Sequence, residues 1–440
     1  MIFQINSTYI LKILIISVFL PSVIFIFPIR LDQLLIFFFG FVTFFGFFVK
    51  WKVPRDGSLF CGCILVLVII ALLPIFLIEE KSLQMLQDRS LIYVISDVER
   101  LIRVVIIILI SASVLQNQNL TDINKLKSSC INLFFLLLSI NSLLIFYIAV
   151  SNNLPDFLLD FYWLTTQESL NETVAGRSYL NSRITGIFLQ PMESGFAYGL
   201  GFLLLLYKNK FSFIFDLKKL ILIILIFIGG ILSISKVFFI GVFFITIITL
   251  FIKLQKFIIN IITLFILSII SFFIFSFVPL EDWNGLNNYS ILFEMIFSFD
   301  IELMIDALTA GRFANPESPV MQMIEQVSKF SPYLGFGAGS FAANEVPVDS
   351  GYMLFYYQTG FIGFTIFVLL IILLVVNQSV KIINMPNDDN YFIYILLLYI
   401  ITTSIGSPVL FLNRSGTILW IFIMIFLVHE NKKKSTSKIA

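Results

Sequence analysis

Long apolar runs dominate this chain of 440 residues, and they restrict its fold more than any other feature. A bilayer core about 30 Å thick is crossed by about 20 apolar residues in a helix. Hydrophobic residues make up 59% of the sequence and charged residues only 12%. The sequence therefore predicts an all-α, polytopic membrane protein. We expect about twelve spans, near residues 9–27, 33–49, 58–78, 101–115, 129–150, 189–207, 220–234, 237–252, 257–278, 352–376, 391–409 and 416–429.

Lysine and arginine in the short connections predict the orientation of these spans. If the N-terminus is cytoplasmic, every inner connection is basic, with Lys50, Lys52, Arg55, Lys125, Lys127, Lys208, Lys210, Lys218, Lys219, Lys253, Lys256, Lys381 and the tail lysines 432, 433, 434 and 438. The acidic residues fall mainly on the other side. Both termini are thus expected inside, and the first run, which lacks a basic leader and a cleavage site, is expected to be an uncleaved span. The net charge of +1 conceals this asymmetry and argues against a nucleic-acid partner.

The connections divide the chain into four parts. Residues 1–188 hold N-terminal spans with outer loops at 79–100 and 151–188, and residues 189–278 hold central spans. Residues 279–351 form a large outer loop, and 352–440 hold the last spans and a basic tail. A connection as long as 279–351 is usually functional or carries its own structure.

The large loop shows signs of local structure. Ser318 and Pro319 suit a helix start, with apolar residues at helical spacing up to residue 330. Upstream, residues 291–308 mix acids with bulky apolar side chains, which fits a helix lying at the lipid surface or one packed on the loop. "GFGAGS" (335–340) resembles a phosphate-binding glycine loop but lacks the preceding strand, so we expect its glycines to permit a tight turn or a close approach.

Cysteine and histidine are scarce. Cys61, Cys63 and Cys130 are expected at inner membrane ends, so no disulfide is predicted. The single histidine, His429, is expected at the inner end of the last span. An outer zinc site is therefore not expected.

Charged residues at the outer membrane edge are candidates for function, because charge beside a span is costly. Arg183 precedes the sixth predicted span and Glu193 lies in its first turn, where helix capping is the alternative role. Lys236 occupies a tight turn between two spans and Arg414 a similar turn, where snorkelling to headgroups is the alternative. For Arg312, in the large loop, the alternative is a surface salt bridge. Arginine and lysine together suit a diphosphate, which guanidinium groups bind bidentately.

Several stretches resemble the O-antigen polymerase and O-antigen ligase superfamily of bacterial envelopes. "SRITGIFLQPMESG" (182–195) resembles its Arg-Leu-x-Gly-x-Phe-x-x-Pro signature, and "ISKVFFIG" (234–241) its Ser-Arg turn, with Lys236 in place of arginine. "AGRFANPESPVMQMIEQVSKFSPYLGFGAGSF" (310–341) resembles its Gly-Arg, helix and glycine-rich segment. "VDSGYMLFYYQTGFIG" (348–363) is similar to its segment re-entering the membrane. The order and spacing of these motifs cover roughly residues 180–370.

The resemblance implies a metal-independent, membrane-embedded glycosyltransferase of the GT-C type, without a cofactor, in the bacterial cytoplasmic (inner) membrane. Its substrates are undecaprenyl-diphosphate-linked sugars at the outer face. Ligases of this family carry an outer-loop histidine, which this chain lacks; Asp349 stands near that position, so a polymerase is favoured. A chain-length regulator and a flippase are implied partners. A ligase on the same fold, and a flippase or secondary transporter, remain alternatives.

Roles follow from that chemistry. Negative charge grows on the departing diphosphate, and Arg183, Lys236 and Arg312, with Arg414, are expected to stabilise it. The acceptor hydroxyl needs a base, with Asp349 as first candidate and Glu193 or Glu317 in reserve. Aromatic residues such as Tyr333 and Tyr352 could stack on sugars, although interfacial belts enrich tyrosine in any case.

Overall fold

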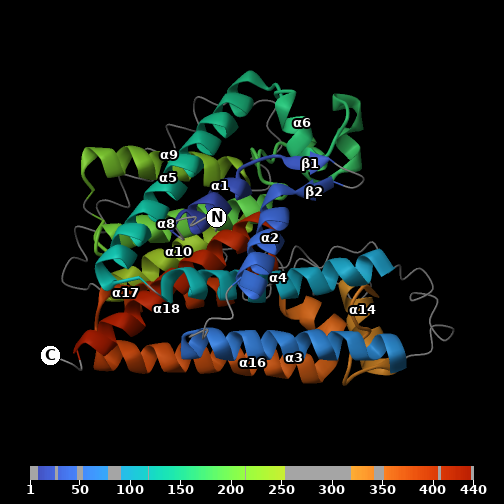
Figure 1. Cartoon of the computed structure of the whole chain (residues 1–440). Helices are drawn as coiled ribbons and strands as arrows, with labels where there is room; N and C mark the ends of the chain where they lie inside the picture. The colour runs from blue at the N-terminus through green and yellow to red at the C-terminus, as the bar shows by residue number, and fades with distance from the viewer. Residues whose placement is uncertain are drawn as a thin grey trace.

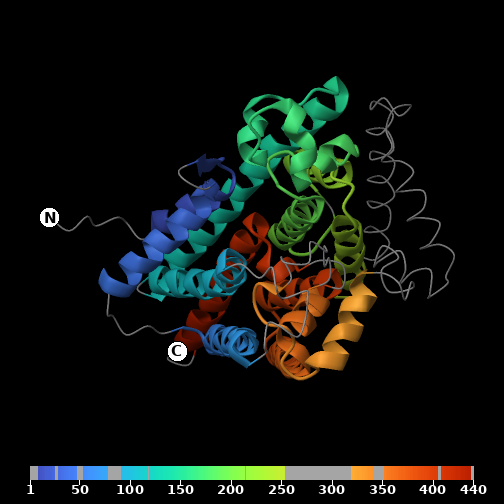
Figure 2. The same cartoon turned by 90° about the vertical axis from the view of Figure 1, so that its right-hand side faces the viewer.

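The computed structural model describes residues 8–24, 28–46, 53–77, 91–116, 118–213, 215–252, 319–340, 351–404 and 408–437. Apart from its connecting segments, the described chain is helical except for one hairpin, in which strand β1 (Ser22–Ile24) pairs antiparallel with β2 (Pro28–Arg30) (Figure 1, and turned by 90° in Figure 2). The long helices are α1 (Thr8–Val18), α2 (Leu31–Gly46), α3 (Arg55–Leu77), α4 (Leu91–Gln116), α5 (Leu120–Ser151), α8 (Pro191–Lys208), α9 (Leu217–Leu232), α10 (Lys236–Ile252), α16 (Gly351–Asn384), α17 (Asp388–Ser404) and α18 (Arg414–Ser437). Shorter elements are α6 (Phe157–Tyr162), η3 (Gln167–Glu172), α7 (Val174–Leu180), α14 (Pro319–Phe330) and η6 (Val409–Phe411).

Three of the helices, α3, α5 and α16, are long and apolar enough to cross a bilayer, and α1, α2 and α10 contain shorter apolar helices. These helices suggest a multi-pass membrane protein. The predicted span 257–278 lies outside the described residues. The predicted span 9–27 is too long, because α1 ends at Val18 and the chain then enters β1. Pro21 lies at this boundary; proline cannot donate the backbone hydrogen bond that a continuing helix needs.

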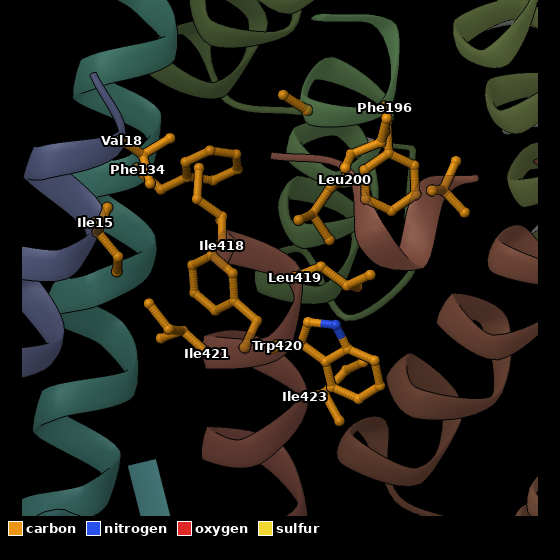
Figure 3. Close-up of a cluster of buried hydrophobic side chains, with 14 of the residues drawn as sticks. Ile15, Val18, Phe134, Phe196, Leu200, Ile418, Leu419, Trp420, Ile421 and Ile423 are labelled. Carbon is orange, nitrogen blue, oxygen red and sulfur yellow. The ribbon is translucent and has the colours of Figure 1, made fainter. Parts of the chain in front are cut away.

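Helix α18 forms the centre of the bundle. Every residue from 418 to 428 is at most 8% exposed, as expected for a helix that is apolar all round. Its side chains lie between Ile15, Val18 and Phe134 on one side and Phe196 and Leu200 on the other (Figure 3). This central helix links the polar groups at the two ends of the bundle.

One end, the Asp389 end, is tied together by buried ion pairs. The Lys127 ammonium lies 2.9 Å from an Asp389 oxygen that also accepts the Tyr207 hydroxyl at 2.7 Å. The His429 ring nitrogen Nδ1 lies 2.7 Å from the other Asp389 oxygen. This network joins α5, α8, α17 and α18. A second ion pair, Lys381–Asp56 at 2.6 Å, joins α16 to α3.

Helix α16 is two helical segments that reverse direction at Gly360. Gly360 has φ 61° and ψ −161°, which is not helical. The rings of Phe355 and Phe367 stack at 4.1 Å and those of Tyr352 and Phe367 lie 6.1 Å apart. Fifteen residues of straight helix would place the last pair about 22 Å apart. The predicted span 352–376 is therefore a half-helix, residues 351–359, folded back on a long helix that starts at Phe361.

The glycine-rich loop 335–340 holds this reversal in place. Gly335, Gly337 and Gly339 have φ of 68°, 83° and 80°, which confirms the predicted tight turn. The backbone N–H groups of 336 and 337 donate to the carbonyls of 357 and 358 at the end of the half-helix, each at 2.9 Å. Those of 338 and 339 donate to Ala71 O at 2.7 Å and to the Asp97 carboxylate at 2.8 Å. Protein acceptors thus occupy the donors that would cradle a phosphate.

Candidate functional site

The N-termini of α8, α10 and α18 meet at the end of the bundle opposite Asp389, and we call this region the Glu193 junction. Arg414 begins α18 fifteen residues before His429, so the two ends are separated by about 22 Å of helix. Glu193 lies in the first turn of α8, which starts at Pro191, the position where proline is best tolerated. The junction therefore combines the positive ends of three helix dipoles.

Glu193 fastens α8 to α18. Its side chain is 2% exposed, and its Oε1 accepts the backbone N–H groups of Arg414 and of Ser415, the latter at 3.3 Å. Its Oε2 accepts the Leu189 N–H at 3.4 Å. The carboxylate satisfies helix-start donors that would otherwise be buried without acceptors. These contacts support helix capping, which was the alternative role expected for Glu193 from the sequence.

The turn between α9 and α10 forms a second side of the junction. Ile234 has φ 46°, so the chain reverses within three residues and α10 starts at Lys236. A Cβ added at Gly195 would lie 2.2 Å from the Ser235 hydroxyl. Only glycine allows α8 to approach the turn this closely. Lys236, predicted at a tight turn, is thereby brought beside the start of α8, with its side chain half-buried.

Arg183 reaches the same region from the segment before α8. The backbone N–H of Ile184 donates to Leu232 O at 3.1 Å, which fixes this segment against the end of α9. The Arg183 side chain is half-buried, and its Nε has no hydrogen-bond partner within the described residues. Arg183 and Lys236 therefore come from adjoining segments, and their joint binding of a diphosphate stays a prediction.

Three buried serine hydroxyls lie at the starts of these helices. Ser194, Ser235 and Ser415 are at most 3% exposed. Their Oγ atoms lack hydrogen-bond partners in the part of the chain that the structure describes. Buried hydroxyls normally find a partner. Serine donors, helix N-termini and nearby cations are the groups that bind an oxyanion.

Arg414 contributes its backbone to the junction and part of its side chain to α1. The residue is 1% exposed, and its Nη1 donates to Val18 O at 2.7 Å and Leu20 O at 3.0 Å. Its guanidinium lies over the Phe161 ring at 5.3 Å. Nε and Nη2 have no partner among the described residues. Arg414 is thus buried in the bundle and does not reach out to lipid headgroups.

Sequence reasoning missed a cluster of buried charges next to Arg414. Arg30 pairs with Asp32 at 3.0 Å, and both are at most 2% exposed. Arg103 lies 3.7 Å from Glu99 and donates to Asn413 at 3.3 Å. Arginines at the edges of apolar runs were the available signal. Their partners, however, are distant in sequence.

Of the other predicted site residues, Tyr333 and Tyr352 lie outside the junction itself. Tyr333 is 66% exposed beside the Gly360 reversal. Tyr352 is half-buried at the far end of the half-helix and donates its hydroxyl to Ile401 O at 3.1 Å. Arg312, Glu317 and Asp349 lie outside the described residues. Within the described ranges, no group of three or more His, Cys, Asp or Glu residues is placed to hold a metal ion.

The apolar helices suggest a multi-pass membrane protein, and the Glu193 junction is a polar, cation-bearing region at one end of its bundle. Comparison with protein-family models, curated proteins and solved structures gives no match to this chain.

Proposed function

We propose that this protein polymerises undecaprenyl-diphosphate-linked oligosaccharide repeat units at the outer face of a bacterial cytoplasmic membrane. The observation that supports the proposal is that Arg183 and Lys236 come from segments that adjoin beside three helix N-termini. The sequence resemblance to O-antigen polymerases and ligases supports the same chemistry. The lysines of the Asp389 end support a cytoplasmic position for that end under the positive-inside rule. The Glu193 junction then faces outward, with both termini inside.

The reaction transfers the growing glycan from its diphosphate carrier to a sugar hydroxyl of the next lipid-linked unit. The bond from the anomeric carbon to the diphosphate oxygen breaks, and undecaprenyl diphosphate leaves with additional negative charge. Arg183, Lys236 and the junction serines stabilise that charge more in the transition state than in the ground state. The lipid diphosphate is itself the activated donor, so no nucleotide is required.

The acceptor hydroxyl loses its proton to a base as the new glycosidic bond forms. We assign this role to Asp349, which lies two residues before the half-helix that begins at Gly351. Glu193 is less suited to it, because its carboxylate already accepts three backbone N–H groups. A base must be free to take a proton from the substrate. Glu317 stays a reserve candidate.

Substitution of Arg183 tests the proposal directly. In the deletion strain complemented with Arg183→Ala, we expect normal membrane insertion and a loss of long-chain polysaccharide, with the rate reduced about 10²–10³-fold. Arg177→Ala, an exposed arginine in α7, is the matched control. Polysaccharide of unchanged chain length in the Arg183→Ala strain would contradict the proposed site. Single repeat units on lipid A-core after deletion fit a polymerase, whereas loss of all attached sugar would mean a ligase.

A further inference from the structure

A surface groove runs between α16 and α17. Its volume is about 240 Å³, and its described lining is Tyr352, Val368, Ile371, Ile372, Val375, Val376 and Ile401. A single water needs only about 10–15 Å³, and a space with so apolar a wall does not hold water well. Ile372 and Val376 are 50% and 54% exposed, so the groove opens on the surface of a membrane-spanning helix. Its natural content is hydrocarbon.

A smaller cavity lies beside the groove, inside the bundle. This cavity, of about 50 Å³, shares Ile371 and Ile401 with the groove. It passes Trp420 and Met424 of α18 and ends beside Asp56, at the Asp389 end. Along the groove, Val368 to Val376 span about 12 Å of helix. A lining that extends this far along one helix fits a linear chain better than a compact molecule.

One end of the groove is linked to the Glu193 junction through intervening residues. Tyr352 and Ile401, which form this end, are joined by their hydrogen bond of 3.1 Å. Two residues before Ile401, the Tyr399 hydroxyl donates to Phe196 O at 3.3 Å, and Phe196 is one turn from Glu193. The Phe355 ring lies 5.2 Å from that of Phe411, three residues before Arg414.

The charge pattern therefore matches an amphiphile with an anionic head. Cations and helix N-termini lie at the junction, whereas no described residue lining the α16–α17 groove is charged. We propose that this groove binds the isoprenoid tail of the lipid-linked diphosphate, with the head at the junction. This inference rests on the proposed function and adds a tail-binding site to it.

The test uses the full chain purified in detergent and measures binding of three probes. Undecaprenyl diphosphate has head and tail, isopentenyl diphosphate has the head and a single isoprene unit, and undecaprenol has the tail alone. Val375→Trp fills the groove, and Ile372→Trp is a second filling variant should the first not purify. Leu373→Trp is the matched control, because Leu373 is 55% exposed on the same helix and does not line the groove.

Filling the groove should lower the affinity for undecaprenyl diphosphate and for undecaprenol at least about tenfold, because excluding two methylene groups from an apolar site already has that effect. Isopentenyl diphosphate should bind unchanged, and Leu373→Trp should resemble the wild type. Equal effects of the filling and control variants would overturn the tail site. So would full competition by an ordinary phospholipid, which would make the groove a general acyl-chain site.

The junction is tested separately in the same assay. Arg183→Gln should weaken the binding of both diphosphates and leave the binding of undecaprenol unchanged. If the wild type binds undecaprenol as tightly as undecaprenyl diphosphate, the proposed function fails. The tail site still stands in that case, provided that Val375→Trp releases undecaprenol.

Discussion

The carboxylate of Glu193 accepts the backbone N–H of Arg414, joining the first turns of α8 and α18 across 221 positions of sequence. The contact lies at the point where three helix starts meet, and it orients α18, the helix at the centre of the bundle. A carboxylate in this position both caps helices and sets the local charge.

Glu193→Gln and Glu193→Ala should separate these two effects. Glutamine retains an oxygen that can accept the Arg414 and Ser415 N–H groups, so the variant should unfold close to the wild-type temperature. Alanine leaves buried donors without acceptors and should cost about 1–3 kcal/mol for each group lost. Thermal unfolding in detergent measures both. A glutamine variant as unstable as the alanine variant would contradict the capping role.

Gly360→Ala should disrupt the reversal within α16. The backbone there, at φ 61° and ψ −161°, is almost restricted to glycine, and a Cβ would lie 2.4 Å from the Tyr333 carbonyl carbon. We expect a loss of at least about 1–3 kcal/mol in unfolding free energy. Gly62→Ala in α3 is the control, since a Cβ there meets nothing within 4 Å and alanine favours the helix. Equal stability of the two variants would refute the reversal.

Asp97→Asn should change the pH dependence of stability. Burial raises the pKa of the Asp97 carboxyl above its usual value, outweighing the lowering effects of Arg100 and of the hydrogen bonds from Gly339 and Gln358. The folded state then binds this proton more readily than the unfolded state. Wild-type stability therefore declines as the pH rises from the usual pKa of an aspartate to the raised pKa of Asp97 in the folded protein. Asparagine can still accept both hydrogen bonds.

We therefore expect Asp97→Asn to be more stable than the wild type at neutral pH, with the difference vanishing below about pH 4. Unfolding temperatures across this range provide the measurement. A difference between the two proteins that does not depend on pH would show that the carboxyl does not titrate in this way.

Asp349→Asn tests the proposed base. Removal of a general base should slow polymerisation about 10²–10⁴-fold while membrane insertion is retained. Glu345→Gln, an acid in the same segment, is the control and should polymerise normally. The measurement is the length distribution of the polysaccharide in complemented cells. Long polysaccharide chains in the Asp349→Asn strain would mean that another carboxylate acts as the base.

Apolar runs were sufficient to predict most of the long helices, because a helix that crosses a bilayer needs a continuous stretch of apolar residues. The reversal of chain direction at Gly360 was not predicted, because residues 352–376 are apolar on both sides of it. Only the backbone angles of Gly360 mark the reversal, and hydropathy does not record them. The paired glycines of "QTGFIG" were its signal. Arg183 and Lys236, selected from the sequence, lie on adjoining segments, and their role in binding a diphosphate stays a prediction. Arg103 was missed because its partner Asn413 is 310 positions away.

The buried network around Asp389 has a consequence for how the molecule flexes. Four helices are clamped there through a single carboxylate, and the neighbouring Lys381–Asp56 pair fastens two more. Separating such desolvated charges is costly. Any loosening of the bundle should then pivot on this clamp, so that the widest displacement falls at the opposite end, at the Glu193 junction.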